Sequence, residues 1–163
     1  MTEVAEKVDE KRKYYPFHDG AKPDAVVVHC SDPRFQEAFG RFVKEELGIE
    51  HSAPIVVPGS VSSVGLELVM PKHLKTLKDN VEMMLSMGKE PRLILINHEE
   101  CKAYAKLSGF FKKAVHLQQA DDLLRAAMLF KKFVTIPLHV SVYMARIDRT
   151  RPAAEQIYFD KLV

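Results

Sequence analysis

Short apolar runs alternate along the chain with segments of helical periodicity. The apolar runs are 25–29, 54–57 and 93–97, and residues 138–145 alternate between apolar and polar side chains. Between them, residues 35–47, 71–88 and 117–133 carry apolar side chains at helical spacing. This alternation predicts an α/β fold, with an open and mainly parallel sheet of about four strands and helices on both faces. Residues 157–159 and 162–163 are apolar, but strand and helix are equally compatible with this segment.

Two of the apolar runs end in chemically reactive side chains. The first is followed by Cys30, and the third by His98 and Cys101, so both cysteines of the chain lie at strand ends. Right-handed crossovers place the carboxyl ends of parallel strands on one edge of the sheet, where open α/β folds bind ligands. We therefore expect these three residues to meet there, with Cys101 in the first turns of a helix that begins near Glu99.

Two thiolates and an imidazole form a ligand set for Zn²⁺. Three protein ligands leave a fourth position open, which is typical of catalytic zinc sites. The interpretation of Cys30, His98 and Cys101 as metal ligands competes with two others. One is a Cys30–Cys101 disulfide, and the other is that Cys30 is a small buried hydrophobic residue. Because no signal peptide is apparent and both cysteines pair with a histidine, a shared metal is favoured.

Asp32 and Arg34 follow Cys30 at two-residue intervals. An arginine can hold a carboxylate in a bidentate pair and keep it ionised. A carboxylate oriented in this way can accept a proton from metal-bound water, or it can ligate the metal itself. Two further residues, His29 and Asn97, precede the ligands on their strands, and we expect them to point to the opposite face.

The two motifs, Cys30-Ser31-Asp32-Pro33-Arg34 and His98-Glu99-Glu100-Cys101, together resemble the C-x-D-x-R and H-x-x-C pair of the β-class carbonic anhydrases. The resemblance covers about residues 25–104. It implies that Cys30, His98 and Cys101 bind zinc, and that an Asp32–Arg34 dyad serves the zinc-bound water. The implied reaction is the reversible hydration of carbon dioxide to bicarbonate by zinc-bound hydroxide, and the implied assembly is a homodimer or a larger even-numbered oligomer.

The chain departs from the family pattern at three places. Pro33 replaces a serine, Lys102 replaces a glycine after the second motif, and residues 58–63 replace a loop rich in glycine and asparagine. These differences support a second hypothesis: a zinc-binding protein of this kind with lost or altered activity, acting on another small electrophile or serving a binding or regulatory role. A cysteine-phosphatase loop is excluded by the spacing of Cys30 and Arg34.

Composition limits the partners and the location. The 163 residues include 24 basic and 22 acidic ones, a net charge of +2, which does not favour nucleic acid as a partner. No apolar run approaches the length of a membrane span, and the charged N-terminus has no apolar signal region, so we expect a cytoplasmic protein. We divide the chain into a helical arm and loop, residues 1–24, and a single zinc-binding α/β domain, residues 25–163. The aromatic residues 14–17 are predicted to anchor the arm.

Overall fold

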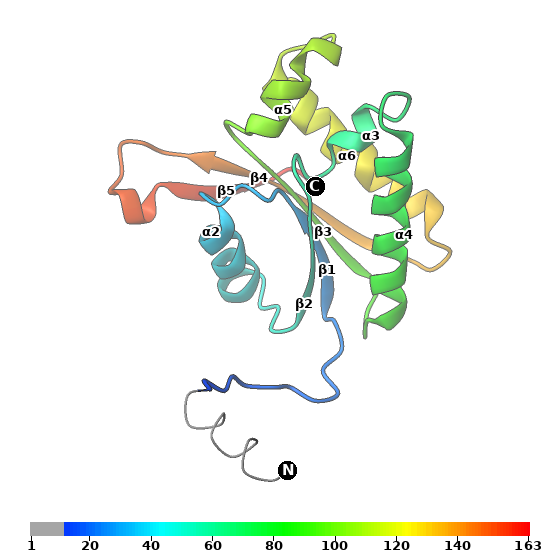
Figure 1. Cartoon of the computed structure of the whole chain (residues 1–163), viewed down its shortest axis with the longest axis vertical. Coiled ribbons are helices and arrows are strands. Elements are labelled where there is room, and N and C mark those ends of the chain that lie inside the picture. The colour runs from blue at the N-terminus through cyan, green and yellow to red at the C-terminus, as the bar shows by residue number, and fades with distance from the viewer. Residues whose placement is uncertain (1–11) are drawn as a thin grey trace, which may run out of the picture.

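The computed structural model describes residues 12–163 of the chain, and the predicted helical arm lies largely outside this range. The strands are β1 (Ala25–His29), β2 (Ser52–Val56), β3 (Arg92–His98), β4 (His139–Ile147) and β5 (Ile157–Lys161). The α-helices are α2 (Gln36–Arg41), α3 (Ser62–Gly65), α4 (Pro71–Met87), α5 (Lys102–Leu107) and α6 (Val115–Phe133). Shorter helical turns are η2 (Phe42–Glu46), η3 (Ser108–Phe110) and η4 (Ala153–Glu155) (Figure 1).

Within residues 12–163, five strands form one sheet in the order β2-β1-β3-β4-β5. The pairs β1–β2, β1–β3 and β3–β4 are parallel, which confirms the mainly parallel sheet predicted from the sequence. A fifth strand, β5, runs antiparallel to β4, so the C-terminal segment that was compatible with either strand or helix is a strand. The chain turns outward from β1 to β2 and then crosses β1 to reach β3. This reversal makes the carboxyl ends of β1 and β3 a topological switch point, where such sheets bind ligands.

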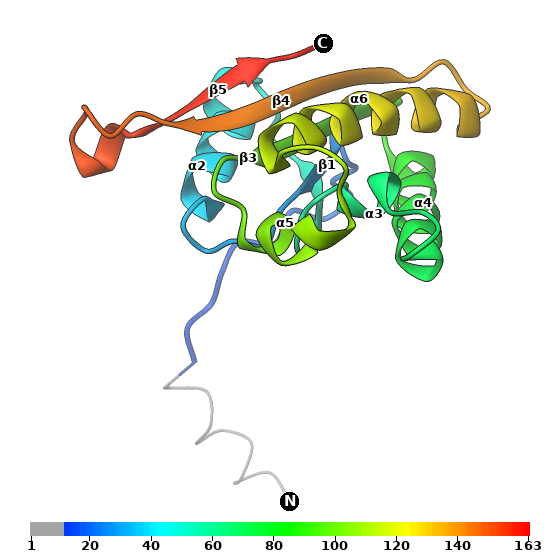
Figure 2. The ribbon, with the colours of Figure 1, turned by 90° about the horizontal axis from the view of Figure 1, so that it is seen from above.

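Side chains of β1, β3 and β4 alternate between two apolar cores, one on each face of the sheet. On one face, Val26 and Leu95 pack with α4 and α6, represented by Val81 and Phe130. On the other face, Val27 and Ile94 pack with the aromatic residues of α2 and η2, including Phe39 and Phe42. Figures 1 and 2 show α2 on the opposite side of the strands from α4 and α6. The predicted placement of helices on both faces is therefore confirmed, and burial of both faces explains the nearly continuous apolar sequence of β1 and β3.

The segment before β1 departs from the sequence prediction. Residues 12–17 are irregular, and Tyr15 and Phe17 are 80% and 86% exposed, so the prediction that they anchor the arm is wrong for these two side chains. This segment runs away from the body of the domain (Figure 2), where no core surface is available to bury the rings. The domain division at residue 24 stays a prediction. Among the described residues, no helix combines the length and apolar character needed to cross a bilayer.

Candidate metal site and carboxylate–guanidinium dyad

The switch point brings together the two motifs. Cys30 follows the last residue of β1, and His98 is the last residue of β3. Cys101 lies directly before α5 with an extended backbone, so the prediction that it sits inside a helix is wrong by one residue. The reason is Glu100, whose φ of 54° is left-handed and interrupts the path from strand to helix. The resulting turn directs Cys101 toward the end of β1.

Cys30, His98 and Cys101 form a buried cluster. Each offers one ligand atom, and these atoms lie within 4.8 Å of one another. The two sulfur atoms are 3.8 Å apart, and the three residues are 4%, 0% and 2% exposed. Both cysteines are free thiols. Two sulfur donors and one imidazole nitrogen converge on one point, so these residues could hold a metal ion such as Zn²⁺ with one tetrahedral position left open.

The hydrogen bonds of His98 leave one ring nitrogen available for a metal. The Nδ1–H group donates to the carbonyl oxygen of Glu99 at 2.8 Å, which fixes the tautomer and the ring orientation. Phe35 packs against the ring, with 4.2 Å between the centroids. Nε2 is buried and has no hydrogen-bond partner among the described residues. A buried, unpaired nitrogen is costly unless a ligand satisfies it, so this atom is consistent with a metal-binding role.

The two thiols differ in acidity. The Cys101 side chain donates a hydrogen bond toward the Cys30 sulfur, and this lowers the pKa of Cys30 despite its burial. The backbone N–H of Gly59 also donates to the Cys30 sulfur at 3.3 Å. The pKa of Cys101 is raised, first by its role as the donor to Cys30 and then by burial. These contacts favour ionisation of one of the two sulfurs, and the thiolate is the form that binds metals.

Asp32 and Arg34 form the bidentate pair expected from their spacing. The Arg34 Nη2 group donates to Asp32 Oδ2 at 2.7 Å, and Nε donates to Oδ1 at 3.0 Å. The Asp32 carboxylate also accepts the backbone N–H of Arg34 at 3.0 Å. These bonds lower the pKa of Asp32 to about 2, so this carboxylate is an anion at neutral pH. The Asp32 side chain is 8% exposed, whereas that of Arg34 is 44% exposed.

Glu100 and Gln36 support the Asp32–Arg34 dyad, a role that was not expected from the sequence. The carbonyl oxygen of Glu100 accepts a hydrogen bond from Arg34 Nη2 at 3.0 Å, and its left-handed backbone turns the carbonyl in that direction. Gln36 donates to the carbonyl oxygens of both Cys30 and Asp32, at 2.9 and 2.7 Å, and so fixes the turn after β1. Neither role has a sequence signal, because both involve backbone carbonyls.

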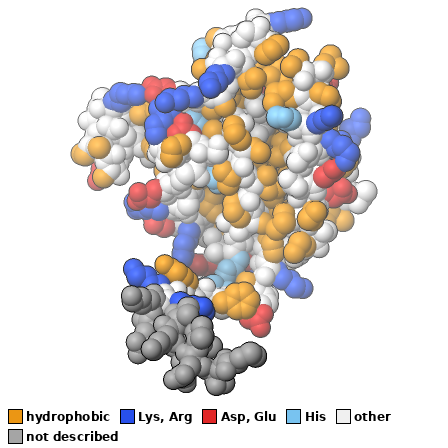
Figure 3. All heavy atoms as spheres, in the orientation of Figure 1, with side chains coloured by type: hydrophobic (Ala, Val, Ile, Leu, Met, Phe, Trp, Pro, Cys, Tyr) orange, Lys and Arg blue, Asp and Glu red, His pale blue; other side chains and the backbone are white. Residues whose placement is uncertain are grey.

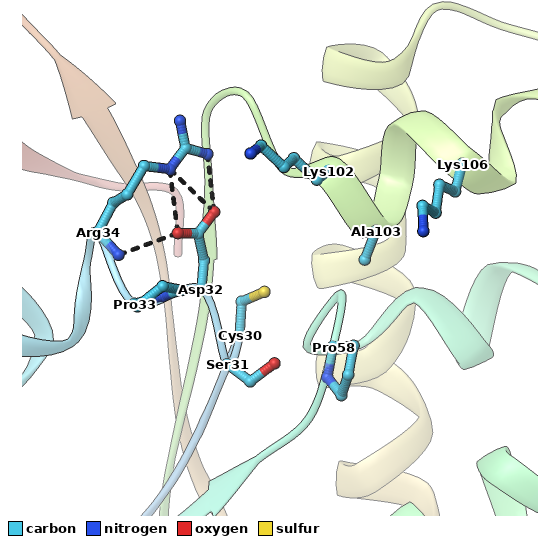
Figure 4. Close-up of a pocket in the computed structure, with 9 residues that line it drawn as sticks. All are labelled: Cys30, Ser31, Asp32, Pro33, Arg34, Pro58, Lys102, Ala103 and Lys106. Atoms are coloured by element: carbon cyan, nitrogen blue, oxygen red, sulfur yellow. Dashed lines mark hydrogen bonds and ion pairs between the residues drawn. The ribbon is translucent and has the colours of Figure 1, made fainter.

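A cavity of about 360 Å³ opens beside Cys30, and we call it the site cavity. Asp32 and Arg34 lie on one side, while Lys102 and Lys106 extend from α5 on the other (Figure 4). The Cys30 sulfur points toward this space (Figure 4). The open side of the candidate metal site therefore faces the dyad and two lysines.

A hydrogen-bonded network of polar side chains lies behind the metal cluster, on the α6 side of the sheet. Asn97 donates to the hydroxyl of Tyr104 at 3.3 Å, and that hydroxyl donates to the buried carboxylate of Asp122 at 2.9 Å. Gln119 of α6 donates to the carbonyl oxygen of His98 at 2.7 Å. Burial raises the pKa of Asp122 to about 6. The network of Asn97, Tyr104, Asp122 and Gln119 anchors the end of β3 to α6.

His29 lies on the opposite face of the sheet from this network. Its ring packs against Phe39 of α2, with 4.6 Å between the ring centroids.

Solved structures similar to this chain are β-carbonic anhydrases. An isoform from Trichomonas vaginalis matches with a TM-score of 0.54 at 11% identity, covering 98% of this chain and 93% of the other. A carbonic anhydrase from Streptococcus mutans matches with a TM-score of 0.51 at 14% identity, covering 98% and 92%. The enzyme CafA from Aspergillus fumigatus matches with a TM-score of 0.55 at 12% identity, covering 88% and 76%. The chain thus has the fold that the two motifs led us to expect.

Sequence comparisons give a weaker relationship. No family model matches the chain. A curated but uncharacterised protein from Rickettsia conorii is 25% identical over 109 residues, which cover 65% of this chain. The matched region spans 55% of the length of that relative. The sequence is therefore far from those of proteins of known activity, although the fold is that of the solved β-carbonic anhydrases.

Proposed function

We propose that this chain is a zinc-dependent lyase of the β-carbonic anhydrase type, which hydrates carbon dioxide reversibly to bicarbonate. The observation that carries the proposal is the buried cluster of Cys30, His98 and Cys101, whose ligand atoms lie within 4.8 Å of one another. The unpaired Nε2 of His98 and the fold of the solved neighbours support it.

Cys30, His98 and Cys101 would hold Zn²⁺, with the site cavity at the remaining position. When bound, Zn²⁺ supplies the Lewis acidity that makes a water molecule nucleophilic near neutral pH. Two thiolates neutralise the charge of the ion, so this effect is smaller than at a site with three neutral ligands. A neighbouring anionic hydrogen-bond acceptor is therefore valuable, and Asp32 is the carboxylate that lines the cavity.

Asp32 orients the reacting water and does not store its proton. Because its pKa is lowered to about 2, it stays ionised at neutral pH and accepts a hydrogen bond from the water. Arg34 holds both carboxylate oxygens, which keeps Asp32 from turning toward the cluster. The partner in this reaction is a small molecule, carbon dioxide or bicarbonate. The proposal includes a cytoplasmic location, favoured by the two free thiols in the part of the chain that the structure describes.

Metal analysis combined with a carbon dioxide hydration assay tests the proposal. We expect one zinc per chain in the parent and in His116→Ala, whose side chain is exposed on α6. His98→Ala removes a ligand and should lose both the stoichiometric zinc and the activity. A parent protein without stoichiometric metal, or with a Cys30–Cys101 disulfide in freshly reduced samples, contradicts the metal site.

A second function is favoured by the composition of the site cavity. Lys102 and Lys106 place two cationic side chains there, and Pro33 has no backbone N–H to donate. These features suit a zinc-binding protein that has changed its substrate or lost its reaction. Stoichiometric zinc without hydration activity from acidic to alkaline pH supports this second function over the first.

A further inference from the structure

A second cavity, of about 520 Å³, lies between α4 and α5, and we call it the α4–α5 cavity. One stripe of α4 lines it, with Thr76, Leu77 and Asn80 at helical spacing. One stripe of α5 faces this stripe and includes Lys106 and Leu107. The end of β2 and the loop after it complete the lining. Figure 3 shows hydrophobic side chains gathered on this face of the molecule.

The α4–α5 cavity combines apolar walls with polar side chains, among them an exposed lysine and a buried serine hydroxyl. Ile55, Leu77 and Leu107 contribute apolar walls. Among the described residues, Lys106 is the only permanently charged side chain that lines the cavity. It forms no ion pair with any described residue. The Ser60 side chain also lines the cavity, and its buried Oγ has no hydrogen-bond partner within residues 12–163. Beside its apolar walls, the cavity therefore presents one ammonium, a buried hydroxyl and neutral polar side chains such as those of Thr76 and Asn80.

The two cavities share a wall. Pro58, Ala103 and Lys106 line both the site cavity and the α4–α5 cavity, and Figure 4 shows Pro58 and Ala103 between Cys30 and Lys106. An occupant of the α4–α5 cavity that pairs with Lys106 therefore reaches the edge of the candidate metal site.

We propose that the α4–α5 cavity binds a medium-chain aliphatic carboxylate, with the alkyl chain inside the cavity and the carboxylate on Lys106. The volume lies within the range of small-molecule pockets, whereas carbon dioxide has three heavy atoms and no need of an apolar chamber. Burial of the alkyl chain is driven by the hydrophobic effect, and a single unpaired ammonium favours a monoanion. This inference goes beyond the proposed reaction, whose substrate and product carry no alkyl chain.

Calorimetric titration of the full, metal-loaded chain with octanoate tests the inference. We expect one octanoate per chain, with weaker binding of 1-octanol, which lacks the charge, and of propionate, which lacks the chain. Lys106→Met keeps the apolar stem and removes the charge, and it should weaken octanoate about tenfold, the loss of one charge-assisted hydrogen bond. Lys112→Met, at an exposed position outside the cavity lining, should bind like the parent.

Thr76→Phe provides a test that is independent of charge. Thr76 is an exposed residue at the rim, so a larger ring there fills the cavity without entering the core. We expect octanoate binding to be lost while zinc content and carbon dioxide hydration are unchanged.

Three outcomes overturn the inference. Octanoate does not bind, or Lys106→Met and Thr76→Phe bind it like the parent, or 1-octanol binds as tightly as octanoate. If octanoate fails to bind and Thr76→Phe lowers the mass measured by light scattering, the occupant is a second copy of the chain. None of these results bears on zinc content or hydration, so the proposed function is judged separately.

Discussion

Arg34 holds Asp32 through three side-chain hydrogen bonds, Nη2 to Oδ2 at 2.7 Å, Nε to Oδ1 at 3.0 Å and Nε to Oδ2 at 3.2 Å. The same guanidinium donates to the carbonyl oxygen of Glu100 at 3.0 Å. One side chain therefore connects the first motif with the second. The pair fixes the position of the Asp32 carboxylate relative to Cys30, His98 and Cys101. If Cys30, His98 and Cys101 hold a metal ion, we expect loss of Arg34 to let Asp32 approach it as a fourth ligand.

Arg34→Ala should keep its zinc and lose hydration activity at neutral pH. The physical reason is that Asp32, released from its partner, can close the open coordination position. Metal content and initial hydration rates of Arg34→Ala are measured beside those of Arg41→Ala, which removes an exposed pair with Glu45 outside the site. An Arg34→Ala protein that hydrates carbon dioxide as fast as the parent shows that the pair has no such role.

Asp32→Asn should also retain zinc, but its hydration rate should fall by roughly 10²-fold or more, because a neutral amide forms a weaker hydrogen bond to the reacting water than a carboxylate and has one acceptor oxygen fewer. The comparison is made on kcat/KM. Asp79→Asn, which alters an exposed pair with Lys75 on α4, is the matched control and should behave like the parent. Equal values for Asp32→Asn and the parent would remove Asp32 from the mechanism.

Gly65→Ala should destabilise the fold by about 1–3 kcal/mol, the typical effect of overpacking. A Cβ atom at Gly65 would clash with Oδ1 of Asp122, and Asp122 is held inside the protein by hydrogen bonds from Tyr104 and Gln118. Gly40→Ala is the control, since its Cβ would meet nothing within 4 Å, and it should be neutral or stabilising. Urea unfolding of both variants measures the difference, and equal midpoints contradict the prediction.

The stability of the parent should fall between pH 4 and pH 6 relative to that of Asp122→Asn. Burial raises the pKa of Asp122 from 3.8 to about 6, so the folded chain binds this proton more tightly than the unfolded chain. Asp122 contributes fully to the free energy of unfolding at pH values below its pKa in the unfolded chain. This contribution is lost as the pH rises through its pKa in the folded chain, by roughly 2–3 kcal/mol at most. Unfolding free energies of the two proteins at pH 4, 5, 6 and 7 test this. A difference that does not change with pH excludes ionisation of Asp122 as the cause.

The chain should assemble into a homodimer or a larger even-numbered oligomer. Strand β2 lies at the edge of the sheet, and closed two-fold assemblies are the commonest among soluble oligomers. Light scattering at micromolar concentration gives the mass, and a monomer mass contradicts the prediction. The same measurement on a chain that begins at Tyr14 shows whether the preceding residues contribute.

Much of this architecture is predictable because the determining signals are local. The runs that form β1 and β3 are apolar on both faces, and their ends identify Cys30 and His98 as neighbours once the sheet is parallel. The prediction that Cys101 lies inside a helix is wrong by one residue. The start of α5 depends on the left-handed backbone of Glu100, a conformation that glutamate rarely adopts.

Other features depend on contacts between distant segments. The packing of Gly65 against Asp122 joins α3 to α6, and no pattern near either residue indicates it. The α4–α5 cavity has the same origin, since its lining combines stripes of two helices with the end of β2. The exposure of Tyr15 and Phe17 contradicts the expectation from hydrophobicity, because burial requires a surface that the fold does not offer there.

The pairing of β1 with β3 has a consequence for metal exchange. Cys30 and Cys101 are 71 residues apart in sequence, and the backbone hydrogen bonds between the two strands already close the loop between them. Binding of a metal ion therefore adds little further restriction to the segment between Cys30 and Cys101. The affinity for the ion is not reduced by the conformational entropy of ordering this segment. In contrast to a zinc finger, which unfolds when a chelator removes its ion, this domain should survive chelation as a folded receptor that can be reloaded repeatedly.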